Sequence, residues 1–177
     1  MQVTLAKSQL AHAIQRMLKI QDMKKILIAL DYNPSAQTVA ETGYTLAKDM
    51  QVQVILLHVM EEPAYYATYE YSPIMGFNSN FIGPETLPPN VNENIRGGAE
   101  AFLQKSKQHL ADDGIETMVQ EGIVADTIVK AALDINASII VLGSHSRRGL
   151  DKILMGSVAE KVLHSSPIPL FIIPTKG

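Results

Sequence analysis

The sequence predicts an α/β domain in which a parallel sheet carries helices on both faces. Three observations support this class. Short aliphatic runs alternate with longer amphipathic stretches from one end of the chain to the other. Polar or glycine residues follow two of these runs, at Asp31 and Gly143, as is typical of the carboxyl ends of parallel strands. The 177 residues are enough for one domain with a buried core.

The composition excludes several classes of protein. The chain has no cysteine, which excludes disulfides, thiolate chemistry and cysteine-ligated metals. The formal net charge is -3, whereas a general nucleic-acid binder is usually strongly basic. The apolar runs are far shorter than the roughly 20 residues that span a bilayer. We therefore expect a cytoplasmic, soluble protein that binds neither nucleic acid nor membrane.

Residues 1–22 are predicted to form an amphipathic N-terminal extension ahead of one domain at 23–177. Ala6, Leu10 and Ile14 recur about one helical turn apart. Three interpretations remain open. The segment packs on its own domain or on a dimer partner, it precedes a natural start at Met23, or it is a transit peptide. It lacks the continuous apolar centre of a secretory signal.

The first half of the domain begins with a predicted buried strand at 23–31, because "MKKILIALD" is a continuous aliphatic run. A helix follows at 34–50, opened by Pro34. The run "QVQVILLHVM" at 51–60 predicts a second buried strand. The polar and aromatic stretch at 61–95 is far longer than an ordinary connection, which indicates a lid, a binding loop or partial disorder.

The middle of the domain continues the alternation. The spacing predicts a helix at 97–114 that is closed by Gly114. Residues 115–122 alternate apolar and polar, which predicts an edge strand with one solvent-facing side. A helix with one apolar side follows at 124–137.

In the last part of the domain, the pattern predicts a buried strand at 138–143, a helix at about 154–165 and a final strand at 168–175. His58 falls in the second buried strand and is interpreted as a core histidine with hydrogen-bond partners. The whole order is β-α-β-α-β-α-β-α-β, so each crossover should be right-handed.

The segment that joins the strand at 138–143 to the next helix has the character of a phosphate site. Gly143 and Gly156 allow close approach of the backbone to a ligand. Ser144, Ser146 and Ser157 supply hydroxyl groups, and the start of a helix attracts an anion through its N–H groups. Each glycine also has an alternative role in chain turning or packing, and Ser157 has one as a helix N-cap.

The basic residues of this segment have two interpretations that we weigh equally. Arg147, Arg148 and Lys152 are either phosphate ligands or a solvated surface. The chain lacks the P-loop, the Gly-x-Gly-x-x-Gly fingerprint and the Gly-x-Ser-x-Gly nucleophile elbow. It also has no cluster of histidine and acidic residues with metal-ligand spacing.

Together with "KKILIALD" and "VILLHV", this segment resembles the universal stress protein family across nearly all of 23–175. Nucleotide-binding members carry Gly-x2-Gly-x9-Gly-Ser/Thr. The matching positions here are Gly143, Ser146, Gly156 and Ser157, with the spacing intact but serine at the second glycine. The stretch "GSVAEKVLHSSPIPLFIIP" also looks like the carboxyl end of the family.

The resemblance implies a three-layer α/β/α fold of the adenine nucleotide alpha hydrolase-like type, with strand order 3-2-1-4-5. It implies ATP, with Mg²⁺, as the ligand, and a homodimer formed through 168–174. Asp31 matches the acid that binds the ribose, and Val59 the residue whose backbone reads adenine. The other matching positions line the base or the phosphates: Ala29, Leu30, Leu142, Gly143, Ser144, Gly156, Ser157 and Val158.

Three functions follow from these observations. The first is an ATP-binding regulatory protein of the stress response, with an unidentified protein partner and at most slow hydrolysis. The second is a dimeric interaction protein in which Ser146 has ended nucleotide binding. The third is an enzyme of phosphoryl or adenylyl transfer, which the missing catalytic groups disfavour. We expect the first, because Asp31, Gly143, Gly156 and Ser157 are all present.

Overall fold

The computed structural model describes residues 25–61, 91–144 and 155–175. The predicted N-terminal extension at 1–22 and most of the long connection at 61–95 lie outside these residues. Within the described ranges, no helix combines the length and the apolar character that crossing a bilayer requires.

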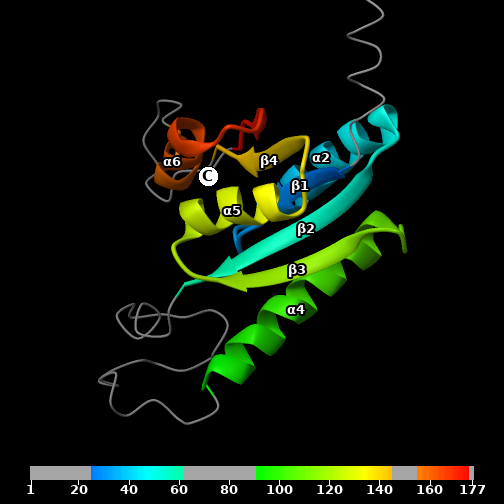
Figure 1. Cartoon of the computed structure of the whole chain (residues 1–177). Helices are drawn as coiled ribbons and strands as arrows, with labels where there is room; N and C mark the ends of the chain where they lie inside the picture. The colour runs from blue at the N-terminus through cyan, green and yellow to red at the C-terminus, as the bar shows by residue number, and fades with distance from the viewer. Residues whose placement is uncertain (1–24, 62–90, 145–154, 176–177) are drawn as a thin grey trace, which may run out of the picture.

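Five strands form one sheet in the order β3-β2-β1-β4-β5, and every neighbouring pair is parallel (Figure 1). This confirms the predicted class and the predicted strand order. Continuous aliphatic runs form the central strands because both of their faces are covered. The strands are β1 (Lys25–Ala29), β2 (Gln53–Met60), β3 (Glu116–Glu121), β4 (Ile139–Gly143) and β5 (Leu170–Ile173).

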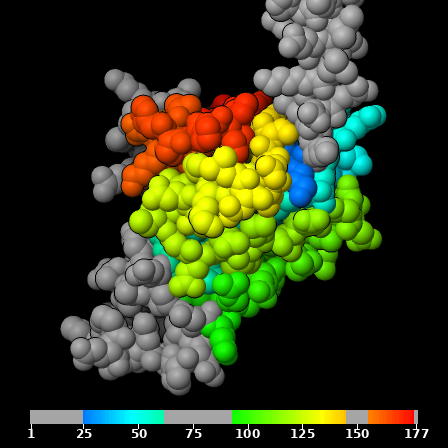
Figure 2. Space-filling view, in the orientation of Figure 1, coloured from blue at the N-terminus to red at the C-terminus, as the bar shows by residue number. Residues whose placement is uncertain are grey.

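Helices cover both faces of the sheet and complete three layers. One apolar core joins α2 and α4 to the sheet, and a second joins α5 and α6 to the opposite face. Figure 2 shows α5 and α6 side by side over their face. The helices are α2 (Ala36–Met50), α4 (Val91–Leu110), α5 (Val124–Asp134) and α6 (Ser157–Ser165).

The alternation of side chains along β1 divides them between the two cores. Ile26 and Ile28 pack toward α2 and α4, whereas Leu27 packs toward α5 and α6, and all three are fully buried. Strand β3 lies at an edge and is only half-buried, as its alternating sequence predicted.

Gly43 sets how closely α2 approaches the sheet. A Cβ atom there would lie 2.8 Å from Cδ1 of Ile28 and 3.1 Å from Cγ1 of Val141. Glycine is unfavourable in the middle of a helix, so this packing explains its presence.

Helix α4 is longer at its start and shorter at its end than predicted. It begins at Val91 rather than 97, because Ile95 and Ala99 bury their side chains against Met60 of β2. It ends at Leu110 rather than at 114. The prediction that Gly114 closes the helix was wrong.

The chain leaves α4 through a left-handed residue, Ala111, at a φ of 51°. Gly114 lies in the following turn, where its N–H donates to Asp112 Oδ1 at 2.8 Å. A similar left-handed residue, Asn136 at a φ of 54°, ends α5 at Asp134 rather than at 137. The conformation of these turns determines where the helices end. The apolar periodicity of the sequence carries no information about that conformation.

The start of α2 is also displaced from its predicted position. The helix begins at Ala36 rather than at Pro34. Asn33 causes the difference, because its side-chain Oδ1 accepts the Ser35 N–H at 3.0 Å and the Ser35 hydroxyl at 2.9 Å. These bonds form a turn before the helix.

Candidate functional site

The predicted site lies where the winding of the sheet reverses. Strand β1 pairs with β2 on one side and with β4 on the other. The connections that leave β1 and β4 therefore depart toward opposite faces of the sheet. In open α/β sheets, ligands bind beyond the carboxyl ends of the strands at such a point. Asp31 and Ser144 follow these two strands and stand at this edge.

Asp31 is exposed, and only one of its carboxylate oxygens is engaged within the described chain. Oδ1 accepts the N–H of Asn33 at 3.2 Å, and Oδ2 accepts no hydrogen bond from a described residue. Asp31 does not cap α2, because Asn33 supplies the side-chain bonds at the start of that helix. The carboxylate can therefore accept further hydrogen bonds from a ligand.

Gly143 is explained by packing rather than by a turn. It is the last residue of β4, and a Cβ atom there would lie 3.0 Å from Cγ2 of Val39 and 3.4 Å from Cγ2 of Thr175. Its φ is not in the left-handed region. The glycine lets α2 and the chain after β5 close around the end of β4.

Ser144 already uses much of its hydrogen-bonding capacity inside the protein. Its N–H donates to the carbonyl of Ile173 at 2.8 Å, and its Oγ accepts the N–H of Thr175 at 3.1 Å. The amide is therefore not available to a ligand. The hydroxyl proton is, because an oxygen that accepts one bond can still donate another.

The start of α6 is joined directly to the end of β4. The N–H of Gly156 donates to the carbonyl of Ser144 at 3.0 Å, so the two ends of the segment between them meet. Gly156 is the N-cap, with a φ of -61° and a ψ of 150°, and makes no side-chain cap bond. The alternative role of Ser157 as N-cap was wrong, because Ser157 is the first helical residue.

This helix start has the features of an anion site. The first bond inside the helix runs from the Glu160 N–H to the Gly156 carbonyl at 2.9 Å. The N–H groups before Glu160 have no partner within the helix, and the helix dipole favours a negative charge beside them. Ser157 and Val158 are exposed there. The residues therefore fit a phosphate group.

The apolar residues of the predicted site divide between the two faces of the sheet. Ala29, Val59 and Leu142 belong to the core on the α5 and α6 face. Leu30 is 5% exposed and packs into the core on the opposite face. Its side chain does not join the other three, so only its backbone faces the same edge. Ser146 and Arg147 lie outside the described residues.

His58 is a neighbour of this edge that the sequence predicted only in part. Its side chain is buried, and its Nδ1 lies 2.8 Å from the carbonyl oxygen of Leu30. Its Nε2 is also buried but has no hydrogen-bond partner within the described chain. The ring packs against Tyr32 and Phe102, whose centroids lie 4.3 Å and 5.7 Å from its own, and these two rings also contact each other. The interpretation as a core histidine is confirmed for burial, and only one nitrogen has a partner.

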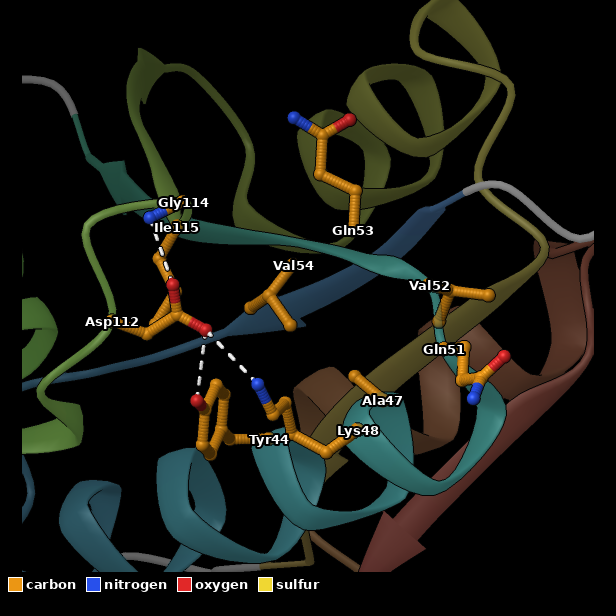
Figure 3. Close-up of a pocket in the computed structure, with 10 residues that line it drawn as sticks. All are labelled: Tyr44, Ala47, Lys48, Gln51, Val52, Gln53, Val54, Asp112, Gly114 and Ile115. Carbon is orange, nitrogen blue, oxygen red and sulfur yellow. Dashed lines mark hydrogen bonds and ion pairs between the residues drawn. The ribbon is translucent and has the colours of Figure 1, made fainter.

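A shallow, open hollow lies at the other end of the sheet. A pocket of about 440 Å³ is formed by the end of α2, the start of β2 and the turn before β3 (Figure 3). Its lining residues are Tyr44, Ala47, Lys48, Gln51, Val52, Gln53, Val54, Asp112, Gly114 and Ile115. None of these was predicted to belong to a site.

The polar side chains of this pocket bind one another. The Tyr44 hydroxyl donates to Asp112 Oδ2 at 2.8 Å, and Lys48 Nζ lies 3.7 Å from the same oxygen (Figure 3). The hydrogen bond from Tyr44, together with the Gly114 N–H and the Lys48 charge, holds the pKa of Asp112 below its ordinary value. These contacts tie α2 to the turn after α4, which indicates a structural role.

Metal binding by side chains has no candidate among the described residues, where no group of three or more histidine or acidic side chains could hold an ion.

Comparisons with known proteins agree with this architecture. The model of the universal stress protein family matches residues 23–174. The universal stress protein MJ0577 of Methanocaldococcus jannaschii is 28% identical over 87% of this chain and 96% of its own length. The solved structure of MJ0577 superposes with a TM-score of 0.62 and covers 87% of this chain and 97% of that one.

Two further relatives extend the comparison. The universal stress protein YxiE of Bacillus subtilis is 28% identical and covers 84% of this chain and 97% of its own length. A solved universal stress protein in complex with cAMP is 17% identical, with a TM-score of 0.56 and coverage of 86% of this chain and 97% of its own. At that identity, the likeness concerns the fold alone.

Proposed function

Because the chain belongs to the universal stress protein family, we propose that it is a stress-response regulatory protein that binds ATP at the carboxyl ends of β1 and β4. One observation carries the proposal. The hydrogen bond from the Gly156 N–H to the Ser144 carbonyl brings the anion-attracting start of α6 to the end of β4, the strand next to β1 and Asp31. An acid for the ribose and N–H groups for the phosphates then flank one crevice.

Several of the predicted residues have a chemical role in this proposal. The open oxygen of Asp31 accepts the ribose hydroxyl groups. Ala29 and the backbone of Val59 contact the adenine. The hydroxyls of Ser144 and Ser157 and the N–H groups at the start of α6 bind the phosphates, with Mg²⁺ offsetting their charge.

The proposed output is binding rather than rapid chemistry. ATP would order the segment between Ser144 and Gly156, and a protein partner would recognise that state. We propose slow hydrolysis at most. The proposed domain spans residues 23–177, with residues 1–22 as an extension ahead of it.

Nucleotide content and calorimetry test this proposal. The purified protein is denatured, its released nucleotides are identified by chromatography, and the nucleotide-free protein is titrated with ATP and Mg²⁺. We expect copurified adenine nucleotide or micromolar affinity. GTP and cAMP serve as comparison ligands. Binding of none of these at millimolar concentration would contradict the proposal.

The alternative of a dimeric interaction protein is favoured by a feature of β5. This strand lies at the edge of the sheet, and its Phe171 side chain is 38% exposed. An exposed edge with a large apolar side chain is a surface that a second copy can cover. We therefore propose a homodimer through residues 168–174, with or without nucleotide.

Replacing Phe171 tests the dimer. Phe171→Lys should weaken association by about tenfold or more, because it removes a large apolar side chain and adds a charge at the edge. Light scattering coupled to size exclusion measures the effect over a range of protein concentrations. Leu133→Lys, at a similarly exposed position on α5, is the matched control. An unchanged dimer in Phe171→Lys would place the interface elsewhere.

A further inference from the structure

Leu30, the residue before Asp31, is held by β2 at both its N–H and its carbonyl. The N–H of Leu30 donates to the carbonyl of Leu57 at 2.8 Å, which extends the pairing of β1 and β2 by one residue. The carbonyl of Leu30 lies 2.8 Å from Nδ1 of His58. That carbonyl and the N–H of Asp31 belong to one planar peptide group. A bond that orients the carbonyl therefore also orients the backbone of Asp31.

The chemistry of this contact assigns the state of His58. A carbonyl oxygen only accepts hydrogen bonds, so Nδ1 must carry the proton and donate. Nε2 is then the bare nitrogen of a neutral ring, buried and without a partner in the described chain. A second proton on Nε2 would create a buried charge whose new N–H has no described acceptor.

The surroundings favour this neutral state. The titratable groups that act on or pack against His58 within the described chain are Asp31 and Tyr32, both from the segment after β1. Helix α4 presents Phe102, and β3 presents Val119 as the register partner. Burial lowers the pKa of His58 below its ordinary value, although the Leu30 bond and the Asp31 charge oppose this shift.

We infer that His58 is a positioning residue of the nucleotide site, which holds the Leu30–Asp31 peptide so that the Asp31 carboxylate meets the ribose. The inference rests on the proposed ATP site and adds a residue that touches no part of the ligand. Neutral His58 is the binding-competent form. Protonation would place a charged Nε2–H in a buried position with no described acceptor, so we expect it to displace the ring and loosen its hold on the Leu30–Asp31 peptide.

Two substitutions of His58 distinguish its hydrogen bond to the Leu30 carbonyl from the volume of its side chain. His58→Asn keeps a donor close to the place of Nδ1 and cannot titrate. His58→Leu keeps apolar volume but leaves the Leu30 carbonyl without its bond. At pH 8 we expect ATP affinity within about threefold of the parent for His58→Asn and about tenfold weaker for His58→Leu, the range of one lost hydrogen bond.

A pH profile gives a readout that packing alone would not change. ATP affinity of the parent protein should fall, relative to that of His58→Asn, as the pH drops through the lowered pKa of His58. The ratio of the two proteins cancels the protonation of ATP itself. His164→Asn, at an exposed histidine of α6, is the control and should follow the parent at every pH.

An ATP-free measurement keeps the inference separate from the proposed function. In ¹⁵N–¹H spectra without ligand, the Asp31 amide should keep its position in His58→Asn and move in His58→Leu. If the parent binds no ATP, the proposed function fails and this amide still decides the positioning role. An unmoved amide in His58→Leu, or equal loss of affinity in both variants, would overturn the inference. If His58→Leu does not fold, two measurements on His58→Asn decide the positioning role. They are the position of its Asp31 amide and its pH profile of ATP affinity compared with that of the parent.

Discussion

The two ends of the sheet differ in how their polar groups are used. At the amino end, Tyr44, Lys48 and Asp112 line a measurable hollow but are bonded to one another. At the carboxyl end, one oxygen of Asp31 accepts no described bond, and the first N–H groups of α6 have no partner within their helix. The hollow at the amino end thus offers a ligand fewer available hydrogen-bond partners than the carboxyl end does.

The comparison shows that a hollow alone does not indicate a ligand site. A pocket whose donors and acceptors satisfy one another stabilises the fold, and a ligand would have to break those bonds to enter. Groups that have no partner within the protein can bind a ligand in exchange for water, without breaking a bond of the fold. Substitutions at the carboxyl end should therefore change ATP affinity with little change in stability, and those at the amino end should do the reverse.

The largest expected effect is at Gly156. Gly156→Val should weaken ATP binding by about 100-fold, or about 2.7 kcal/mol, because the side chain fills the approach of the phosphates to α6. A φ of -61° and a ψ of 150° are open to valine, so the helix start can keep its backbone. Calorimetry measures the affinity.

Gly97→Ala provides the control for Gly156→Val. It lies in α4, and a Cβ atom there would have no other atom within 4 Å. Its ATP affinity should equal that of the parent. If Gly156→Val binds ATP as well as the parent, the start of α6 is not the phosphate site.

The next effect concerns the motif position that departs from the family pattern. If residue 146 requires a left-handed backbone, serine costs about 1–2 kcal/mol there, and Ser146→Gly should strengthen ATP binding by about fivefold to thirtyfold. The same calorimetric titration measures it. Weaker binding after this change would instead identify the hydroxyl as a ligand of ATP.

The smallest expected effect is at Asp112, in the pocket at the amino end of the sheet. Asp112→Ala should lower the melting temperature by a few degrees and leave ATP affinity unchanged, because it breaks the contacts between α2 and the turn after α4. Scanning calorimetry and an ATP titration of the same sample measure both. Lost ATP affinity with unchanged stability would make this pocket a ligand site.

The pH dependence of Asp112→Ala has a definite sign. The Tyr44 bond lowers the pKa of Asp112 in the folded protein, so the folded state binds this proton less readily than the unfolded state. The stabilisation is present above the ordinary pKa of 3.8 and is lost as the pH falls through the lowered value. The difference in melting temperature between parent and variant should therefore shrink in acid.

The α/β class and the order of the elements could be predicted from the sequence because its signals are local and agree with one another, whereas the strand order came from the family resemblance. The continuous aliphatic run forms β1, a central strand whose middle residues are buried. The alternating run forms β3, a half-buried strand at the edge of the sheet. The errors in the predicted helix boundaries came from the turns beside the helices. Asn33 delayed the start of α2, and Ala111 ended α4 before Gly114.

The site was less predictable because it depends on three-dimensional pairing. The motif identified the segment that starts at Gly143, but not that a side chain there would meet Val39 and Thr175. Residue order also cannot show that the side chain of Leu30 faces the opposite core, or that His58 bonds its carbonyl. Such contacts join residues far apart in the chain.

Amide mapping of ATP binding tests the central claim most directly. ¹⁵N–¹H spectra recorded during an ATP titration locate the ligand without any substitution. The account predicts that the amides of Asp31, Val59 and Ser157 shift together, while those of Tyr44, Lys48 and Asp112 stay in place. Shifts confined to the amino-end pocket, or none at millimolar ATP, would contradict it.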